Sequence, residues 1–266
     1  MRHSDVIGLM RAACLFSSMS SWFSALIWFA AASLGPAHEP VTPAPRPVLV
    51  ELFTSQGCPL CPAANQYLGE LDQRDDVIAL GYGVSYWDFY GWEDTYARPE
   101  FVERQQVYRD SLDVPRIYTP QFVIDGSAEA SGVETDAIRS ALERRRMAMP
   151  ASVEVSTEAL GDGNHRIRVV GSMPSDQSAD VWLVVFQPGW QVVEIESGNN
   201  AGLDMRLYNP VQALLDLGEW KSGVAFFGAS LPEGSSAVVI VQAPNGGPVY
   251  GAAQFARDPV PFAAAD

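Results

Sequence analysis

Cys58 and Cys61 are the residues of this sequence whose type and spacing point most directly to chemistry. Only Pro59 and Leu60 separate them, and the third cysteine of the chain, Cys14, lies far upstream in an apolar N-terminal stretch. A structural disulfide stabilises a protein mainly by closing a long loop, and this pair would close almost none. The spacing therefore predicts thiol chemistry, with a static disulfide or half of a metal site as the alternatives.

Other catalytic chemistries have few candidate residues in this chain. Of its three histidines, His3 and His38 precede the predicted fold and His165 lies in its second half, while Lys221 is the only lysine. A histidine-based triad, a Schiff base, a phosphate-binding lysine and a zinc site are therefore not expected, and no cofactor is predicted. Copper(I) carriage by the two cysteines ranks last, because no methionine lies close to them in sequence.

The N-terminus predicts export. Arg2 and Arg11 precede the apolar residues 12–34, and small residues follow, which is typical of a cleaved signal peptide covering residues 1–37. The stretch is long for a signal, so an uncleaved membrane anchor is the alternative. We expect a periplasmic or secreted protein without stable membrane insertion once the signal is cleaved. Its formal net charge of −15 makes nucleic acid an unsuitable partner.

The elements that must position the cysteine pair follow a proline-rich tether over residues 38–47. Because the pair falls between a strand and a helix, the Cys58 sulfur should face the unpaired N–H groups at the helix start, which lowers its pKa. Cys61, one turn later, should be buried, so Cys58 is predicted to attack and Cys61 to resolve. The hydrophobic pattern predicts strands at 48–53, 77–84 and 122–124, and helices at 59–71, 99–112 and from about 131 to 145.

The second half of the chain has a different hydrophobic pattern. Alternating apolar and polar residues with glycine-rich turns predict a mostly antiparallel, β-sandwich-like domain over residues 150–258, interrupted by one helix at 210–217 and followed by a flexible tail at 259–266. The basic run at 144–146, just before it, is expected to be a solvated helix end. Strands are predicted at 152–156, 166–170, 181–186, 192–195, 224–227, 237–241 and 249–255.

The order strand, helix, strand, helix, two strands, helix resembles the thioredoxin superfamily over residues 48–149, and Cys-Pro-Leu-Cys at 58–61 is closest in style to glutaredoxins. The resemblance implies a cis-proline at Pro120, with Thr119 beside it, where the backbone binds the substrate chain like an added strand. The alternative is a trans proline that only opens a strand. It also implies a buried acid that moves protons, for which Glu51 is the candidate. Glu51 lies seven residues before Cys58 rather than six, and a solvent-facing strand residue is the other interpretation.

Several motifs together resemble a family of secreted bacterial proteins catalogued as a domain of unknown function. That resemblance covers nearly the whole chain after the leader and implies fold and export without implying a substrate. The motifs are the run at 51–58, Tyr86-Trp87-Asp88, Gly91-Trp92, Tyr118-Thr119-Pro120-Gln121 and Asn200-Ala201-Gly202.

The aromatic residues between Tyr86 and Tyr96 could line a substrate groove or pack an inserted segment onto the sheet, and the packing role is preferred. Trp87 and Tyr118 join Thr119 as candidate substrate-binding residues. Asp88 is interpreted as the cap of a turn.

The sequence thus predicts an exported thiol–disulfide oxidoreductase that exchanges a disulfide with a protein substrate and is reset by a redox partner. The alternative is a non-catalytic envelope binding module in which the cysteine bridge is structural.

Overall fold

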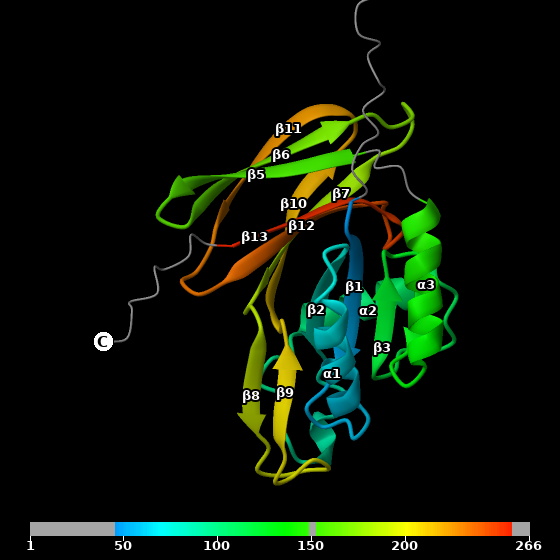
Figure 1. The fold of residues 1–266 in the computed structure, drawn as a ribbon, viewed down its shortest axis with the longest axis vertical. Coiled ribbons are helices and arrows are strands. Elements are labelled where there is room, and N and C mark those ends of the chain that lie inside the picture. Colours follow the sequence, from blue (N-terminus) through cyan, green and yellow to red (C-terminus); the bar gives the residue numbers. More distant parts are fainter. Residues whose placement is uncertain (1–45, 149–152, 257–266) are drawn as a thin grey trace, which may run out of the picture. The chain divides into compact units, whose positions relative to one another are not determined.

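The computed structural model describes residues 46–148 and 153–256. The predicted signal peptide, nearly all of the tether and the C-terminal tail lie outside these residues. The described chain is mixed α/β, with most of its strands in antiparallel sheets and few helices (Figure 1). No helix within the described ranges is long and apolar enough to cross a membrane.

The first sheet is built around the strand that leads to the cysteine pair. β1 (Val48–Thr54) pairs in parallel with β2 (Val77–Gly83) and antiparallel with β3 (Gln121–Ile124), which pairs with β4 (Ala128–Ser131). Every residue of β1 is buried, so both faces of the sheet must be covered. The sheet order is β2-β1-β3-β4, and the predicted order of helices and strands is confirmed in this region.

Successive side chains of β1 point to opposite faces of the sheet and so pack into two different hydrophobic cores. Val50 and Leu52 pack with α1 (Cys61–Leu71) and α3 (Thr135–Ala148), whereas Leu49 and Phe53 pack on the side of α2 (Pro99–Ser111). Pro62 lies in the first turn of α1, where its missing N–H costs no helical hydrogen bond. A short 3₁₀ helix, η1 (Asp88–Tyr90), precedes α2.

The later strands form three further sheets. The four-stranded sheet has the order β10-β7-β12-β13, the three-stranded sheet has the order β11-β6-β5, and β8 and β9 form a hairpin. One apolar cluster takes residues from both larger sheets, including Val169 and Val239, so the two sheets face each other across a core. The bounds are β5 (Val153–Gly161), β6 (Asn164–Gly171), β7 (Ala179–Phe186), β8 (Trp190–Glu194), β9 (Asp204–Tyr208), β10 (Val211–Trp220), β11 (Gly223–Ser230), β12 (Ser236–Gln242) and β13 (Val249–Ala256).

The predicted helix at 210–217 is wrong, because β10 (Val211–Trp220) occupies that segment. β10 pairs with β7 over its whole length, with register shifts between Val211 and Ala213 and between Asp216 and Gly218. These irregularities break the strict alternation of apolar and polar residues that identifies a strand in sequence. The local pattern therefore imitated a helix.

The first sheet and the β-rich region share a hydrophobic core. One cluster joins Leu49 and Phe53 of β1 to Phe186 of β7 and to Val238 and Ile240 of β12, all nearly without exposure. The predicted boundary between two domains falls at 149–150, outside the described residues, and the division into domains stays a prediction.

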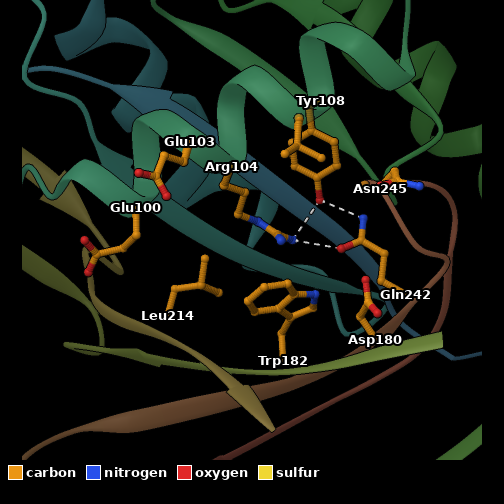
Figure 2. A pocket seen from close by; sticks show the side chains of 11 residues that line it. Glu100, Glu103, Arg104, Tyr108, Asp180, Trp182, Leu214, Gln242 and Asn245 are labelled. Atoms are coloured by element: carbon orange, nitrogen blue, oxygen red, sulfur yellow. Dashed lines mark hydrogen bonds between the residues drawn. The ribbon is translucent and has the colours of Figure 1, made fainter. Parts of the chain in front are cut away.

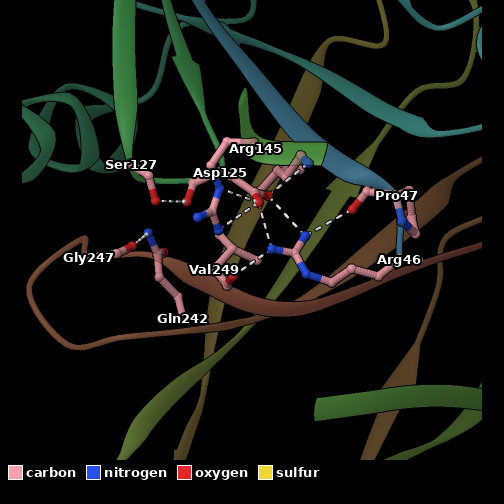
Figure 3. A network of polar contacts seen from close by, with 9 residues as sticks. Arg46, Pro47, Asp125, Ser127, Arg145, Gln242, Gly247 and Val249 are labelled. Carbon is pink, nitrogen blue, oxygen red and sulfur yellow. Dashed lines mark hydrogen bonds and ion pairs between the residues drawn. The ribbon is translucent and has the colours of Figure 1, made fainter. Parts of the chain in front are cut away.

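A buried carboxylate links three separate parts of the chain (Figure 3). Asp125, at the turn after β3, forms ion pairs with Arg46 at 2.5 Å and with Arg145 of α3 at 3.0 Å, and its side chain is 1% exposed. Its Oδ1 accepts a hydrogen bond from the Leu49 amide, and Arg46 donates to the Val249 carbonyl of β13. The solvated interpretation of the basic run at 144–146 is therefore wrong for Arg145, because a carboxylate twenty residues upstream holds it.

Candidate functional site

The cysteine pair lies where β1 ends and α1 begins, as the sequence predicts. The Cys58 amide donates to the Ser55 carbonyl and the Cys61 amide donates to the Cys58 carbonyl, so one tight turn brings both cysteines to the helix start. Both are free thiols, and only 1% of Cys58 and none of Cys61 is exposed. The predicted Cys58–Cys61 disulfide stays a prediction.

The two thiols differ in acidity. The pKa of Cys58 is lowered to about 6, first by a hydrogen bond from Cys61, against the effect of burial, and further by hydrogen bonds from Thr119 and from the backbone of Leu60 and Cys61. The pKa of Cys61 is raised well above its ordinary value, mainly by burial and then by its hydrogen bond to Cys58. A Cys58 thiol of lowered pKa that accepts a hydrogen bond from a protonated Cys61 matches the division of roles that thiol exchange requires.

Three further predicted residues lie at the pair or directly beside it. Thr119 hydrogen-bonds the Cys58 sulfur, and its hydroxyl accepts a bond of 2.7 Å from the indole N–H of Trp87. The Thr119–Pro120 peptide bond is cis, as expected, and Pro120 is buried just before β3. The structure thus brings Cys58, Cys61, Trp87 and Thr119 together, with Pro120 adjacent in the chain.

Tyr118 points to a different place. Its hydroxyl donates to the Glu129 carboxylate on β4, and its carbonyl accepts a bond from the Gln105 amide of α2. The side chain therefore belongs to the β3–β4 edge of the sheet rather than to the surroundings of the cysteines.

Glu51 is also held away from the cysteines. It is fully buried, which makes the solvent-facing interpretation wrong, and the Arg104 guanidinium of α2 donates to its two oxygens at 2.7 and 3.2 Å. The Tyr108 hydroxyl donates to the same carboxylate, and Gln242 of β12 bonds both Arg104 and Tyr108 (Figure 2). Arg104 and Tyr108, which donate to the Glu51 carboxylate, both come from α2, so the structure does not bring Glu51 to the pair.

The aromatic stretch divides between packing and exposure. Trp87, Trp92 and Tyr96 pack against the cluster that contains the cysteines, whereas Phe89 and Tyr90 are exposed. The preferred packing role is thus correct for the first three. The Asp88 carboxylate accepts a bond from the Asp94 amide at 3.2 Å, which is the turn cap that the sequence predicts.

Asp94 is a site residue that the sequence analysis missed. It is buried, and its carboxylate accepts bonds from the backbone amides of Gln56 at 2.7 Å, Tyr96 at 2.9 Å and Ala97 at 3.1 Å. Burial raises its pKa to about 6. The carboxylate therefore fixes the turn that precedes Cys58, and nothing in the sequence distinguishes Asp94 from the neighbouring Glu93 and Asp88 for that role.

The β8–β9 hairpin covers the pair, and this was not predicted. Ile195, Met205 and Leu207 form one buried cluster with Cys58 and Cys61. The hairpin packs against α1 (Figure 1). A Cβ on Gly69 of this helix would lie 2.5 Å from the Trp190 ring, so only glycine fits at this position. A hairpin more than 130 residues downstream thus closes the site.

Two asparagines at the tip of the β8–β9 hairpin form hydrogen bonds with the backbone of the cysteine turn. The Asn200 amide donates to the Gln56 carbonyl at 2.7 Å and to the Cys58 carbonyl at 3.1 Å. Asn199 donates to the Gly57 carbonyl at 3.3 Å. These bonds explain the Asn200-Ala201-Gly202 motif, since the asparagine closes the site and Gly202 adopts a positive φ of 80° in the turn.

Comparison with solved structures finds a relative of similar extent. Protein AGR_C_4864 from Agrobacterium tumefaciens is 27% identical in sequence with a TM-score of 0.68, over 80% of this chain and 95% of that one. A domain of the outer membrane lipoprotein Omp28 from Porphyromonas gingivalis gives a TM-score of 0.22 at 10% identity, over 40% of this chain and 88% of that one, which is too low to indicate a shared fold. No curated protein matches the sequence.

One family model matches most of the chain. It is described as a protein of unknown function, DUF1223, and the match covers residues 49–242, which include the cysteine turn, the cis-proline and the hairpin that covers them. The expected membership of a family of unknown function is thereby confirmed: the chain belongs to the DUF1223 family.

Proposed function

We propose that this chain is an exported thiol–disulfide oxidoreductase with a thioredoxin-like first half. The observation that carries the proposal is the pairing of an acidified Cys58 with a protonated Cys61 at the start of α1. The element order around the pair and the cis bond before Pro120 support the likeness to thioredoxins.

The exchange would run in two balanced steps. The Cys58 thiolate attacks one sulfur of a substrate disulfide, the substrate S–S bond breaks, and a mixed disulfide forms as one substrate thiolate leaves. Cys61 then gives its proton to the substrate thiolate released in the first step and attacks the Cys58 sulfur, which forms the Cys58–Cys61 disulfide and releases the second substrate thiolate. Two electrons pass to the substrate, and a dithiol partner must return them.

Measurement of the reduction potential in glutathione buffers tests this proposal. We expect a value between about −270 and −120 mV, as in exchanging dithiols. Cys61→Ala should accumulate a mixed disulfide with a model disulfide such as insulin, while Cys58→Ser should not. A potential below about −300 mV would instead indicate a structural bridge.

The alternative of a static bridge in an envelope binding module has one observation in its favour. Cys58 is only 1% exposed beneath the hairpin, so a protein disulfide cannot reach it in this conformation. Under the redox proposal the hairpin must therefore move away from the cysteine turn before exchange.

Copper(I) carriage also gains one observation. No methionine is close to the cysteines in sequence, but Met205 of β9 packs in the same buried cluster and would add a thioether to two thiolates. Retention of copper by the reduced protein after desalting, lost in Met205→Leu but kept in Met173→Leu, would favour this function. Equal retention of copper by the Met205→Leu and Met173→Leu variants would show that Met205 is not a copper ligand.

The acidity of Cys58 should be visible in its titration. The alkylation rate and the ultraviolet thiolate absorbance should rise with pH and reach half their change near pH 6. In Cys61→Ala the midpoint should move upward, because the largest cause of the lowered pKa is lost. An unchanged midpoint in that variant would contradict the role assigned to the Cys61 hydrogen bond.

A further inference from the structure

A cavity of about 320 Å³ lies between α2 and the sheet β10-β7-β12. Figure 2 shows Glu100 and Glu103 toward one end and Asp180 and Asn245 toward the other. Neither cysteine lines it, so it is a second site candidate.

The middle of the cavity is apolar. Trp182 of β7 and Leu214 of β10 are partly buried and line the cavity, and the more exposed Val107 of α2 adds to its apolar wall. One side of Trp182 already faces a cation, since the Arg104 guanidinium carbon lies 6.0 Å from the indole ring centroid. The remaining apolar wall offers contact area for methylene groups.

The carboxylates of the cavity have no protein partners. No side-chain hydrogen bond or ion pair joins the carboxylates of Glu100, Glu103 or Asp180 to another residue of the part that the structure describes. The pKa of Asp180 is raised, first by burial and then by the negative charges of the nearby Asp216 and Glu219. Unpaired carboxylates at two ends of a partly desolvated cavity favour positive groups at both ends.

The base of the cavity does not favour an anion. Arg104 is its one cationic lining residue, and the Glu51 carboxylate neutralises it through two hydrogen bonds. The same guanidinium also donates to Tyr108 and Gln242. The charge of Arg104 is thus balanced by Glu51 and is not available to pair with an anionic ligand.

We propose that this cavity binds a linear aliphatic polyamine. Protonated amines would pair with Glu100 and Glu103 at one end and with Asp180 at the other, and the methylene chain between them would lie against Trp182 and Leu214. The formal net charge of −15 adds a long-range attraction for such cations. This site is independent of the redox function.

Calorimetric titration with spermidine at physiological ionic strength tests the proposal. We expect saturable binding to the wild-type protein and at least a tenfold weaker affinity in the Glu103→Gln/Asp180→Asn double variant. Glu158→Gln, which removes one carboxylate from the exposed part of β5, should bind like the wild type. Cys58→Ser should also bind normally, so failure of the redox proposal would leave this result untouched.

Three outcomes of the spermidine titration would overturn the polyamine site. These are no saturable heat with spermidine, equal affinity in the double variant and the wild type, or complete displacement of spermidine by an equal concentration of Mg²⁺. Binding of succinate in place of spermidine would likewise show that Arg104 rather than the carboxylates selects the ligand. Unchanged urea midpoints for all variants serve as the folding control.

Discussion

Arg104→Leu should lower the free energy of unfolding by about 3 to 5 kcal/mol, measured by urea denaturation. The side chains of Arg104 and Glu51 are 6% and 0% exposed, so loss of the guanidinium leaves a buried carboxylate without its counter-charge. Tyr108 and Gln242 each lose a charged partner as well. The network around Glu51 is therefore expected to serve stability first.

The same helix provides a matched control. Arg109 pairs with Asp110, but these side chains are 38% and 68% exposed, so Arg109→Leu should cost less than about 1 kcal/mol. The double variant Glu51→Leu/Arg104→Leu should recover part of the loss, because it removes both buried charges. If Arg104→Leu and Arg109→Leu were equally mild, the buried pair would not hold α2 against β1.

Asn200→Ala should increase the alkylation rate of Cys58 by about 5- to 150-fold at fixed pH. The variant loses two hydrogen bonds to the carbonyls of Gln56 and Cys58, each contributing about 0.5 to 1.5 kcal/mol to the closed state. When the hairpin opens and closes faster than the reagent reacts, the rate follows the open population. Iodoacetamide labelling followed by mass spectrometry measures this rate.

Substitutions at neighbouring residues of the hairpin tip should change the alkylation rate of Cys58 by smaller amounts. Asn199→Ala loses one longer bond of 3.3 Å and should accelerate labelling less than Asn200→Ala does. Glu196→Gln, exposed in the same loop, should leave the rate unchanged. Equal labelling of all three variants and the wild type would mean that the hairpin tip does not control access to Cys58.

Local patterns were sufficient to predict the elements that hold the cysteines. The apolar run at 48–53, the helical spacing after Cys58 and the proline before residues 121–124 each depend on neighbours within a few positions. The locations of these elements were predicted correctly for that reason, whereas the cis bond at Pro120 was expected only from the resemblance to thioredoxins.

Long-range contacts account for what the sequence did not reveal. Asn200 reaches the Cys58 turn across 142 residues, and Arg104 reaches Glu51 across 53. No repeating pattern in the sequence marks either contact. Polar residues in loops and helices are ordinarily exposed to solvent, so their sequence positions do not indicate a buried partner. The error at 210–217 has the same origin, because pairing of β10 with β7 overrides its local pattern.

The carboxylate of Asp125 bears on the order in which the protein can be completed during synthesis. Its partner Arg46 donates to the Val249 carbonyl, and the Val249 amide donates to the Asp125 carbonyl, so the first folded residues contact the last strand. During translation β1 and β3 emerge long before β13 does. The first sheet can therefore complete its contacts only once nearly the whole chain is available, and until then the apolar surface that β13 helps to cover stays exposed.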